Sequence, residues 1–200
     1  MKRFITACLL IFVAGIALTS CKTMSPAEYE AMQEKARQAD VLAERLRKLE
    51  SAHASMQQEL KAEIEAQRIQ IEKLSDREVK MTMQEDVLFP SSSIVINQQG
   101  REMLGKIANS LKQAPDAAIK IVGHTDLLPI TDPKLKKRYV DNWELSAARA
   151  ASVARVFIWG ENINEERIHV VGRSYVEAIG DNRTEEGRAR NRRIEIFLVQ

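Results

Sequence analysis

Apolar residues follow a helical spacing through the first half of the chain. The segment from Ala27 to Phe89 contains neither Pro nor Gly, and from Leu42 to Leu60 its apolar residues recur at alternating spacings of four and three. Most other positions carry Ala, Glu, Lys, Gln or Arg, which favour helix. The pattern predicts a helical stalk over residues 27–76 with one narrow, coiled-coil-like apolar seam.

The start of the predicted helix is marked by a cap, and its apolar seam requires a packing partner. Ser25 is placed as the N-cap, Pro26 occupies the first helical position, and Glu28 completes a capping box. A helix with one narrow seam is not stable alone, so it should pair with copies of itself or with the following domain. A solvated spacer is favoured over a defined parallel homo-oligomer, because His53 and Gln67 interrupt the seam.

The pattern changes after Asp76, where short alternating stretches are separated by helical ones. The predicted strands cover residues 79–89, 118–123, 167–171 and 194–198, and the predicted helices cover residues 97–115, 143–159 and 184–190. Strands separated by helices predict an α+β, two-layer domain with helices on one face of a small sheet, here residues 77–200.

The N-terminal residues have the organisation of a secretory leader. Lys2 and Arg3 precede an uncharged run from Phe4 to Leu18, which is followed by small residues. These are the parts of a signal peptide, predicted at residues 1–20, and the run is shorter than the roughly 20 residues that a membrane-spanning helix needs.

The sequence Leu-Thr-Ser-Cys ending at Cys21 resembles a bacterial lipobox. This resemblance implies that Cys21 becomes the lipidated first residue of the mature chain, followed by a linker to residue 26. Lys22 at the next position implies sorting to the outer membrane. Cys8, the other cysteine, lies in the leader, so no disulfide framework is expected.

Composition narrows the class of protein. The chain is 44% hydrophobic and 29% charged, which excludes a polytopic membrane protein and a wholly disordered one. The formal charge of +2 includes two cations of the predicted leader, so the remainder is near neutral. A nucleic-acid binder would carry a large basic excess, and nucleic acid is therefore not an expected partner.

Three motifs in the C-terminal part place charged groups near element ends. They are Gly-His-Thr-Asp at residues 123–126, Asn-Trp-Glu-Leu-Ser-Ala-Ala-Arg-Ala at residues 142–150, and Gly-Arg-Ala-Arg-Asn-Arg-Arg at residues 187–193. Asp126 ends a strand, and Arg149 lies two turns into a helix whose free N-terminus offers N–H groups to an anion. A carboxylate, a guanidinium and a helix end could together hold an amino-acid zwitterion.

In this order and on this frame, the three motifs resemble the OmpA-like peptidoglycan-binding domain over residues 80–200. That family includes the peptidoglycan-associated lipoprotein and the periplasmic part of the flagellar stator protein MotB. The resemblance implies a site for the diaminopimelate of the peptidoglycan stem peptide. It places Asp126 at the amine and Arg149 at the carboxylate, with Asn142 and Arg192 completing the pocket.

The segment after Asp126 departs from the simplest family members. Leu-Leu-Pro-Ile at residues 127–130 replaces a short polar turn, and residues 134–138 hold four cations. This longer segment is similar to the MotB-type variant. The basic cluster is interpreted as a solvated loop, with contact to anionic glycan or lipid as the alternative.

The sequence lacks the residues that an enzyme or a proton-driven stator would need. Serine-type hydrolysis would need a nucleophile and its partners, and no Gly-x-Ser-x-Gly occurs; His124 and His169 without cysteine make no metal site. A proton-driven stator needs an ionisable group within a membrane helix, which the run from Phe4 to Leu18 lacks. No cofactor is expected.

The sequence thus predicts a lipid-anchored, non-enzymatic outer-membrane protein, facing the periplasm, that tethers the membrane to peptidoglycan. The alternatives are an envelope component of a motility or division machine anchored by the same domain, or a peptidoglycan hydrolase. If the site residues form exposed ion pairs, replacing Asp126 or Arg149 by Ala should abolish binding and barely change stability.

Overall fold

The computed structural model describes residues 25–200, and the predicted signal peptide and lipidated Cys21 lie outside the described residues. Helix α2 spans Pro26–Glu59 and begins as predicted. The Glu28 N–H donates to Ser25 Oγ at 3.2 Å, and the Ser25 N–H donates to the Glu28 carboxylate at 2.8 Å. The chain divides into one unit that ends at Leu42 and a second of residues 43–200.

The helical stalk expected over residues 27–76 is shorter than predicted. Helix α2 ends at Glu59, a short helix α3 follows at Lys61–Glu65, and strand β1 occupies Ile69–Ser75. The reversal is made at Gln67, whose φ of 55° is in the left-handed region. The prediction therefore wrongly continued the helix through residues that form strand β1.

Strand β1 is stabilised by its pairing, which the local sequence does not reveal. Ile69 lies opposite Met83 and Ile71 opposite Met81 on the neighbouring strand, while Gln70 between them is exposed. This alternation is the period of a half-buried strand, and tertiary pairing overrides the helix preference of the segment.

The apolar seam of α2 belongs to the domain from residue 43 onward. The Ser110 hydroxyl, on helix α5 (Gln98–Leu111), donates to the Ser55 hydroxyl at 3.0 Å, and Ser51 donates to Gln113 at 2.9 Å. The seam residues buried in the core are Leu49, Ala52 and Met56, followed by Leu60 just after the helix. The domain boundary predicted at residue 77 is therefore wrong, because this part of the helix packs inside the domain.

The domain is built on a five-stranded sheet with the order β1-β2-β5-β3-β4. The remaining strands are β2 at Glu78–Gln84, β3 at Ala118–Gly123, β4 at Ile168–Gly172 and β5 at Arg193–Val199. β3 and β4 are parallel, and the other neighbours are antiparallel. The α+β class is confirmed.

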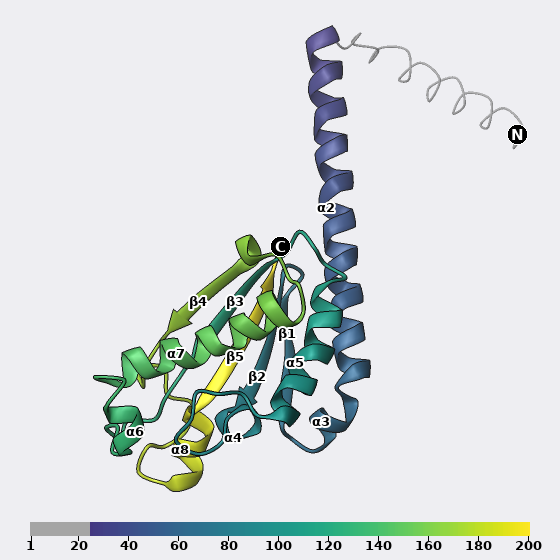
Figure 1. The fold of residues 1–200 in the computed structure, drawn as a ribbon. Coiled ribbons are helices and arrows are strands. Elements are labelled where there is room, and N and C mark those ends of the chain that lie inside the picture. Colours follow the sequence, from purple (N-terminus) through teal and green to yellow (C-terminus); the bar gives the residue numbers. More distant parts are fainter. Residues whose placement is uncertain (1–24) are drawn as a thin grey trace, which may run out of the picture. The chain divides into compact units, whose positions relative to one another are not determined.

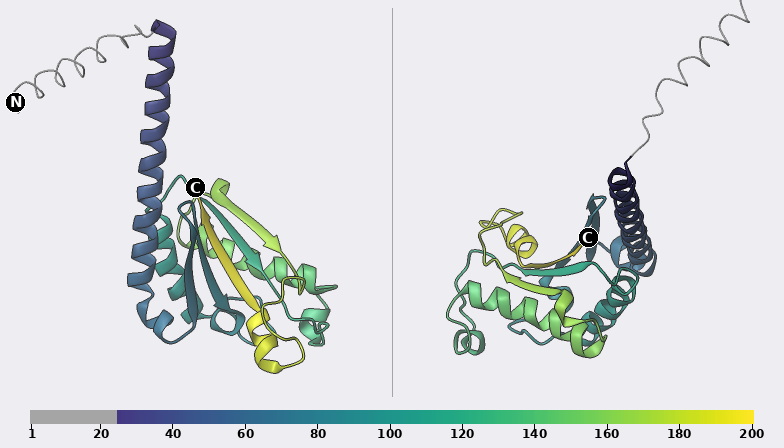
Figure 2. Two further views of the ribbon diagram at one scale, coloured as in Figure 1. Left: turned by 180° about the vertical axis from the view of Figure 1, so that it is seen from behind. Right: turned by 90° about the horizontal axis from the view of Figure 1, so that it is seen from above.

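Helices α5 and α7 (Asn142–Arg155) lie on one face of the sheet, and the strands are open to view from behind (Figures 1 and 2). The helices after β2 are α4 (Glu85–Leu88), α5 (Gln98–Leu111), α6 (Pro133–Lys136), α7 (Asn142–Arg155), the π-helical turn η1 (Val156–Gly160), the 3-10 turn η2 (Glu165–Arg167) and α8 (Glu185–Asn191). The strand expected over residues 79–89 thus ends at Gln84, where α4 begins.

The core lies between the sheet and the elements α2, α4, α5, α7 and η1. Met81, Ile196 and Ile121 lie side by side on the three central strands and are fully buried. Burial of each such side chain contributes about 1.5–3 kcal/mol relative to exposure. Among residues 25–200, no helix combines the length and the apolar character that a membrane crossing requires.

Candidate functional site

Three strand ends meet at one edge of the sheet. Asp126 follows β3, Glu85 follows β2, and Arg192 precedes β5, which runs antiparallel to both. Backbone hydrogen bonds join the ends: the Glu85 N–H donates to the Arg192 carbonyl, and the His124 N–H donates to the Arg193 carbonyl, each at 2.9 Å. Charged side chains far apart in the sequence are thereby brought together.

Helix α7 reaches this edge because two glycines let it approach the sheet closely. A Cβ added to Gly123 would lie 2.1 Å from the Ser146 carbonyl oxygen, and one added to Gly172 would lie 2.8 Å from the Ala147 nitrogen. No side chain fits at either position. Arg149 follows about one turn later on α7 and reaches the strand ends.

Arg149 forms a buried, two-pronged ion pair with Glu85. The Arg149 Nη1 donates to Glu85 Oε2 at 2.6 Å, and Nη2 lies 2.5 Å from Oε1. Only 6% of the Arg149 side chain and 15% of the Glu85 side chain are exposed. Burial raises the pKa of the Glu85 carboxyl, and the attraction of Arg149 opposes this effect.

The premise that Arg149 makes an exposed pair is therefore wrong. Its guanidinium satisfies a carboxylate that is also removed from water, and it lies 5.9 Å from the ring centroid of Phe89. Removing one partner of a buried pair leaves an uncompensated charge, which costs about 3–5 kcal/mol. Arg149 thus stabilises the domain in addition to any role in binding.

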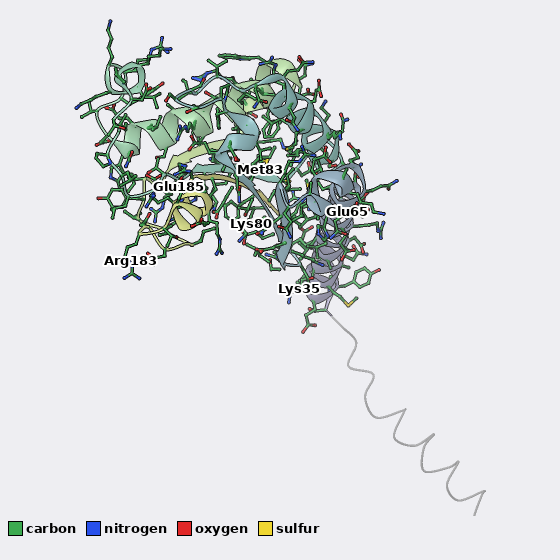
Figure 3. All side chains as sticks on the ribbon, turned by 90° about the horizontal axis from the view of Figure 1, so that it is seen from below. Lys35, Glu65, Lys80, Met83, Arg183 and Glu185 are labelled. Carbon is green, nitrogen blue, oxygen red and sulfur yellow. The ribbon has the colours of Figure 1, made fainter. Side chains whose placement is uncertain are left out.

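Asp126 forms the second pair, with Arg192. The Arg192 Nη1 donates to Asp126 Oδ2 at 2.6 Å, and the Leu128 N–H donates to Oδ1 at 3.0 Å. The other prong of Arg192 donates to Glu185 of α8 at 2.8 Å, at the position labelled in Figure 3. The Arg192 side chain is 30% exposed, so this pair faces solvent where the first does not.

Asn142 holds the loop that carries Asp126. Its Nδ2 donates to the Leu128 carbonyl at 2.9 Å and to the Asp126 carbonyl at 3.3 Å. Both donors of the buried amide are therefore used by the backbone. Asn142, which was expected to complete the pocket, acts in this structure as a positioning residue.

The N-terminus of α7 is capped, whereas the sequence analysis expected it to be free. The Asp141 carboxylate accepts the N–H groups of Trp143 and Glu144, at 2.9 and 3.0 Å. The Glu144 carboxylate accepts the Val140 N–H at 2.7 Å. The N–H groups of Trp143 and Glu144 are therefore satisfied within the chain and are not open to an anion.

All four predicted binding residues, Asp126, Asn142, Arg149 and Arg192, line one open cleft with a volume of about 390 Å³. We name it the ion-pair cleft. Its remaining lining residues are Glu85, Ser91, Ser92, Thr125, Leu128, Pro129, Ile130, Thr131, Asp132, Leu135, Leu145 and Glu185.

Sequence reasoning missed three of the cleft's carboxylates, Glu85, Asp132 and Glu185, and the cap of α7. The spacing of Asp141 and Glu144 is a helix-start signature that could have identified the cap. Glu85 gave no such signal, because it lies in a stretch that was assigned to a continuing strand. Glu185 marks the first turn of α8, a position typical of an acidic residue.

A separate buried cluster lies behind the cleft. His124 Nε2 is 3.3 Å from Glu195 Oε2, and Arg193 Nε donates to Glu195 Oε1 at 2.8 Å. Burial acts to raise the pKa of Glu195, but these two partners outweigh it and lower the pKa to about 2. His124 is thus a buried residue at the end of β3 that contacts Glu195. Within residues 25–200, no group of three or more His, Cys, Asp or Glu side chains could hold a metal ion.

Comparison with known proteins gives one family. A family model described as the OmpA family matches residues 88–192. The Bacillus subtilis protein YtxE, described as uncharacterised, is 35% identical over 139 residues, which are 70% of this chain and 53% of that protein. The peptidoglycan-binding protein ArfA of Mycobacterium tuberculosis is 38% identical over 97 residues, which are 48% of this chain and 27% of that protein.

A solved structure resembles the chain in both sequence and fold. The cell wall anchor of the T6SS from Pseudomonas aeruginosa is 34% identical with a TM-score of 0.64, and the match covers 72% of this chain and 96% of that one. The chain spans about half the length of the first curated relatives it matches, 53% and 47%.

Proposed function

Because the chain belongs to the OmpA family, we propose that it binds peptidoglycan non-covalently through the diaminopimelate of the stem peptide. The observation that carries the proposal is the convergence of Asp126, Asn142, Arg149 and Arg192 on one open cleft. A relative named a peptidoglycan-binding protein and a structure described as a cell wall anchor support the same ligand.

The charges of the ion-pair cleft suit a zwitterion. Each guanidinium is paired with a carboxylate, Arg149 with Glu85 and Arg192 with Asp126. The ligand's ammonium would contact Asp126, and its carboxylate would contact a guanidinium. Each new ion pair would then replace one that the chain forms within itself. Every buried charge then still has a partner when the ligand is bound. An ion of only one sign would instead leave one buried charge without a partner.

The two guanidiniums are not equally available to the ligand. Arg192 is partly exposed and shares its prongs between Asp126 and Glu185, so it can turn to a ligand carboxylate. Arg149 is held by Glu85 and contributes its fixed charge, or shares a prong with the ligand. Asn142 keeps the Asp126 loop in place for both.

Binding without catalysis is the activity we assign to this cleft. The histidine beside the cleft, His124, contacts Glu195, and within residues 25–200 it makes no hydrogen bond to a serine. The charged side chains that line it are engaged in ion pairs or helix caps. The proposal requires no cofactor or metal.

For the whole chain, the proposed role is to tether the outer membrane to peptidoglycan. Lipid attached to Cys21 would anchor the chain to the membrane, facing the periplasm, and the helix before residue 43 would provide reach. A second candidate is the anchoring of an envelope machine, which the similarity to the T6SS cell wall anchor favours.

The cleft is tested by calorimetric titration of the purified chain with a stem-peptide fragment that contains diaminopimelate. Asp126→Asn keeps the acceptor for the Leu128 N–H but removes the charge that meets the ammonium. We expect at least a tenfold loss of affinity, about 1.4 kcal/mol.

The matched control is Asp132→Asn, which lies on the same cleft and keeps its capping of α6 because Asn is an equally good N-cap. Binding unchanged in Asp126→Asn, or lost equally in both variants, would contradict the assignment of Asp126.

A further inference from the structure

A second cleft adjoins the ion-pair cleft. It has a volume of about 550 Å³ and lies between the segment 92–95 and the segment 134–139 that contains α6. We name it the basic cleft, because Lys134, Lys137 and Arg138 line it. Ser92 and Leu135 line both clefts, so one extended ligand can reach from one into the other.

The cations of the basic cleft differ from those of the ion-pair cleft in having no partner. Within residues 25–200, no carboxylate lies at ion-pair distance from Lys134, Lys137 or Arg138, and all three are exposed. The nearest acidic group, Asp132, already accepts the backbone N–H groups of Lys134 and Leu135. Three positive charges therefore face one concave surface, and among the described residues the attraction of Asp132 to Lys134 offsets only part of that charge.

The segment is an ordered turn and not a loose loop. Asp132 caps α6, Pro133 occupies its first turn, and the buried Leu135 anchors it to the domain. The Tyr139 N–H donates to the Leu135 carbonyl at 2.8 Å, which closes the turn. The backbone that carries the cations is therefore held in place around Leu135, which reduces the entropy cost of ordering this segment when an anion binds.

The opposite wall selects for an anion that is part of a peptide. The segment 92–95 presents the hydroxyls of Ser92 and Ser93 and the exposed apolar side chain of Val95. Hydroxyls and an apolar patch accept a peptide backbone and a small side chain, and the cations accept its carboxylates. A phosphate-rich surface would not need the apolar patch.

We propose that the basic cleft binds a second carboxylate of the same wall peptide whose diaminopimelate occupies the ion-pair cleft. The inference rests on the proposed function and extends it from one residue to a longer ligand. A stem peptide carries free carboxylates besides those of diaminopimelate, and each peptide residue adds about 3.5 Å of reach. Binding at both clefts makes the anionic peptide, and not diaminopimelate alone, the preferred ligand.

The test compares three ligands by calorimetric titration of the whole chain. They are free diaminopimelate, a stem-peptide fragment with free carboxylates, and the same fragment with the carboxylates outside diaminopimelate amidated. We expect the free-carboxylate fragment to bind at least tenfold more tightly than the amidated one, with a stronger dependence on salt.

The triple variant Lys134→Gln/Lys137→Gln/Arg138→Gln should lose this preference and bind the two fragments equally. Its affinity for free diaminopimelate should remain that of the unmodified chain. The matched control is Lys136→Gln, which removes a charge from the same segment at a position that does not line the cleft. The control should keep the tenfold preference.

Two results would overturn the inference. In the first, the triple variant keeps the preference for the free-carboxylate fragment. In the second, the unmodified chain binds the free-carboxylate and amidated fragments equally while the triple variant loses binding to vesicles that contain anionic lipid, which assigns the cleft to a membrane surface. If the unmodified chain binds none of the three ligands, the proposed function itself fails, and this outcome is distinct from both.

Discussion

The two ion pairs of the central cleft are alike in chemistry and different in consequence. Glu85–Arg149 is buried between α4 and α7, and both carboxylate oxygens contact the guanidinium. Asp126–Arg192 joins a loop to the end of α8 and faces solvent on the arginine side. The first pair stabilises the cleft, and the second presents charge to a ligand.

This difference shows that position in a motif does not reveal how a residue acts. Asp126 and Arg149 both belong to motifs that resemble a binding site, and the sequence treats them as equals. Burial separates them, because a buried charge must be matched whether or not a ligand is present. Experiments on the two pairs should therefore give different ratios of lost stability to lost binding.

The largest expected effect is on stability, from Arg149→Met. Removing the guanidinium leaves Glu85 buried without a partner, and the free energy of unfolding should fall by about 3–5 kcal/mol, measured by urea titration. The double variant Glu85→Gln/Arg149→Met replaces both charges and should recover much of this loss. Wild-type stability of the single variant would show that the pair contributes nothing to the fold.

Glu195 provides a second, smaller effect that depends on pH. Its pKa in the folded chain is about 2, below the ordinary 4.5, because His124 and Arg193 stabilise its charge. The folded state thus favours the ionised form, so this stabilisation is complete above pH 4.5 and is lost as the pH falls towards 2.

Thermal unfolding between these pH values should accordingly show a steeper loss of stability in the unmodified chain than in Glu195→Gln. The variant is less stable at neutral pH, and the two curves should converge under acid conditions. Parallel curves across the whole range would rule out Glu195 as the source of the acid sensitivity.

The smallest expected effect on stability comes from Arg192→Gln. Its ion pairs with Asp126 and Glu185 are partly exposed, so their loss should cost no more than about 1 kcal/mol. Affinity for the diaminopimelate fragment should still fall, because the guanidinium that can turn to the ligand carboxylate is removed. A stability loss as large as that of Arg149→Met would remove the distinction between the two pairs.

The local elements of the domain could largely be predicted from the sequence. β3 has the predicted bounds at residues 118–123, and the helix from Asn142 begins within one residue of its predicted start. Both have strong local signals, since alternation ends at Gly123 and an acidic cap precedes the helix. The convergence of the four predicted residues was implied by the resemblance to the OmpA-like family.

The errors arose where pairing across the fold decides the structure. β1 carries residues compatible with helix, and only its partner strand makes it extended. No sequence motif indicates the role of Glu85, because that role is its ion pair with Arg149, which is 64 residues away. The burial of the α2 seam depends likewise on α5, which the heptad spacing alone does not specify.

The most direct test of the central claim is a crystal structure of the chain with diaminopimelate bound. We predict that one ammonium group lies within hydrogen-bond distance of the Asp126 carboxylate. The adjacent carboxylate of the ligand should contact the guanidinium of Arg192 or Arg149. Density for the compound at another surface, with both ion pairs of the cleft undisturbed, would contradict the claim.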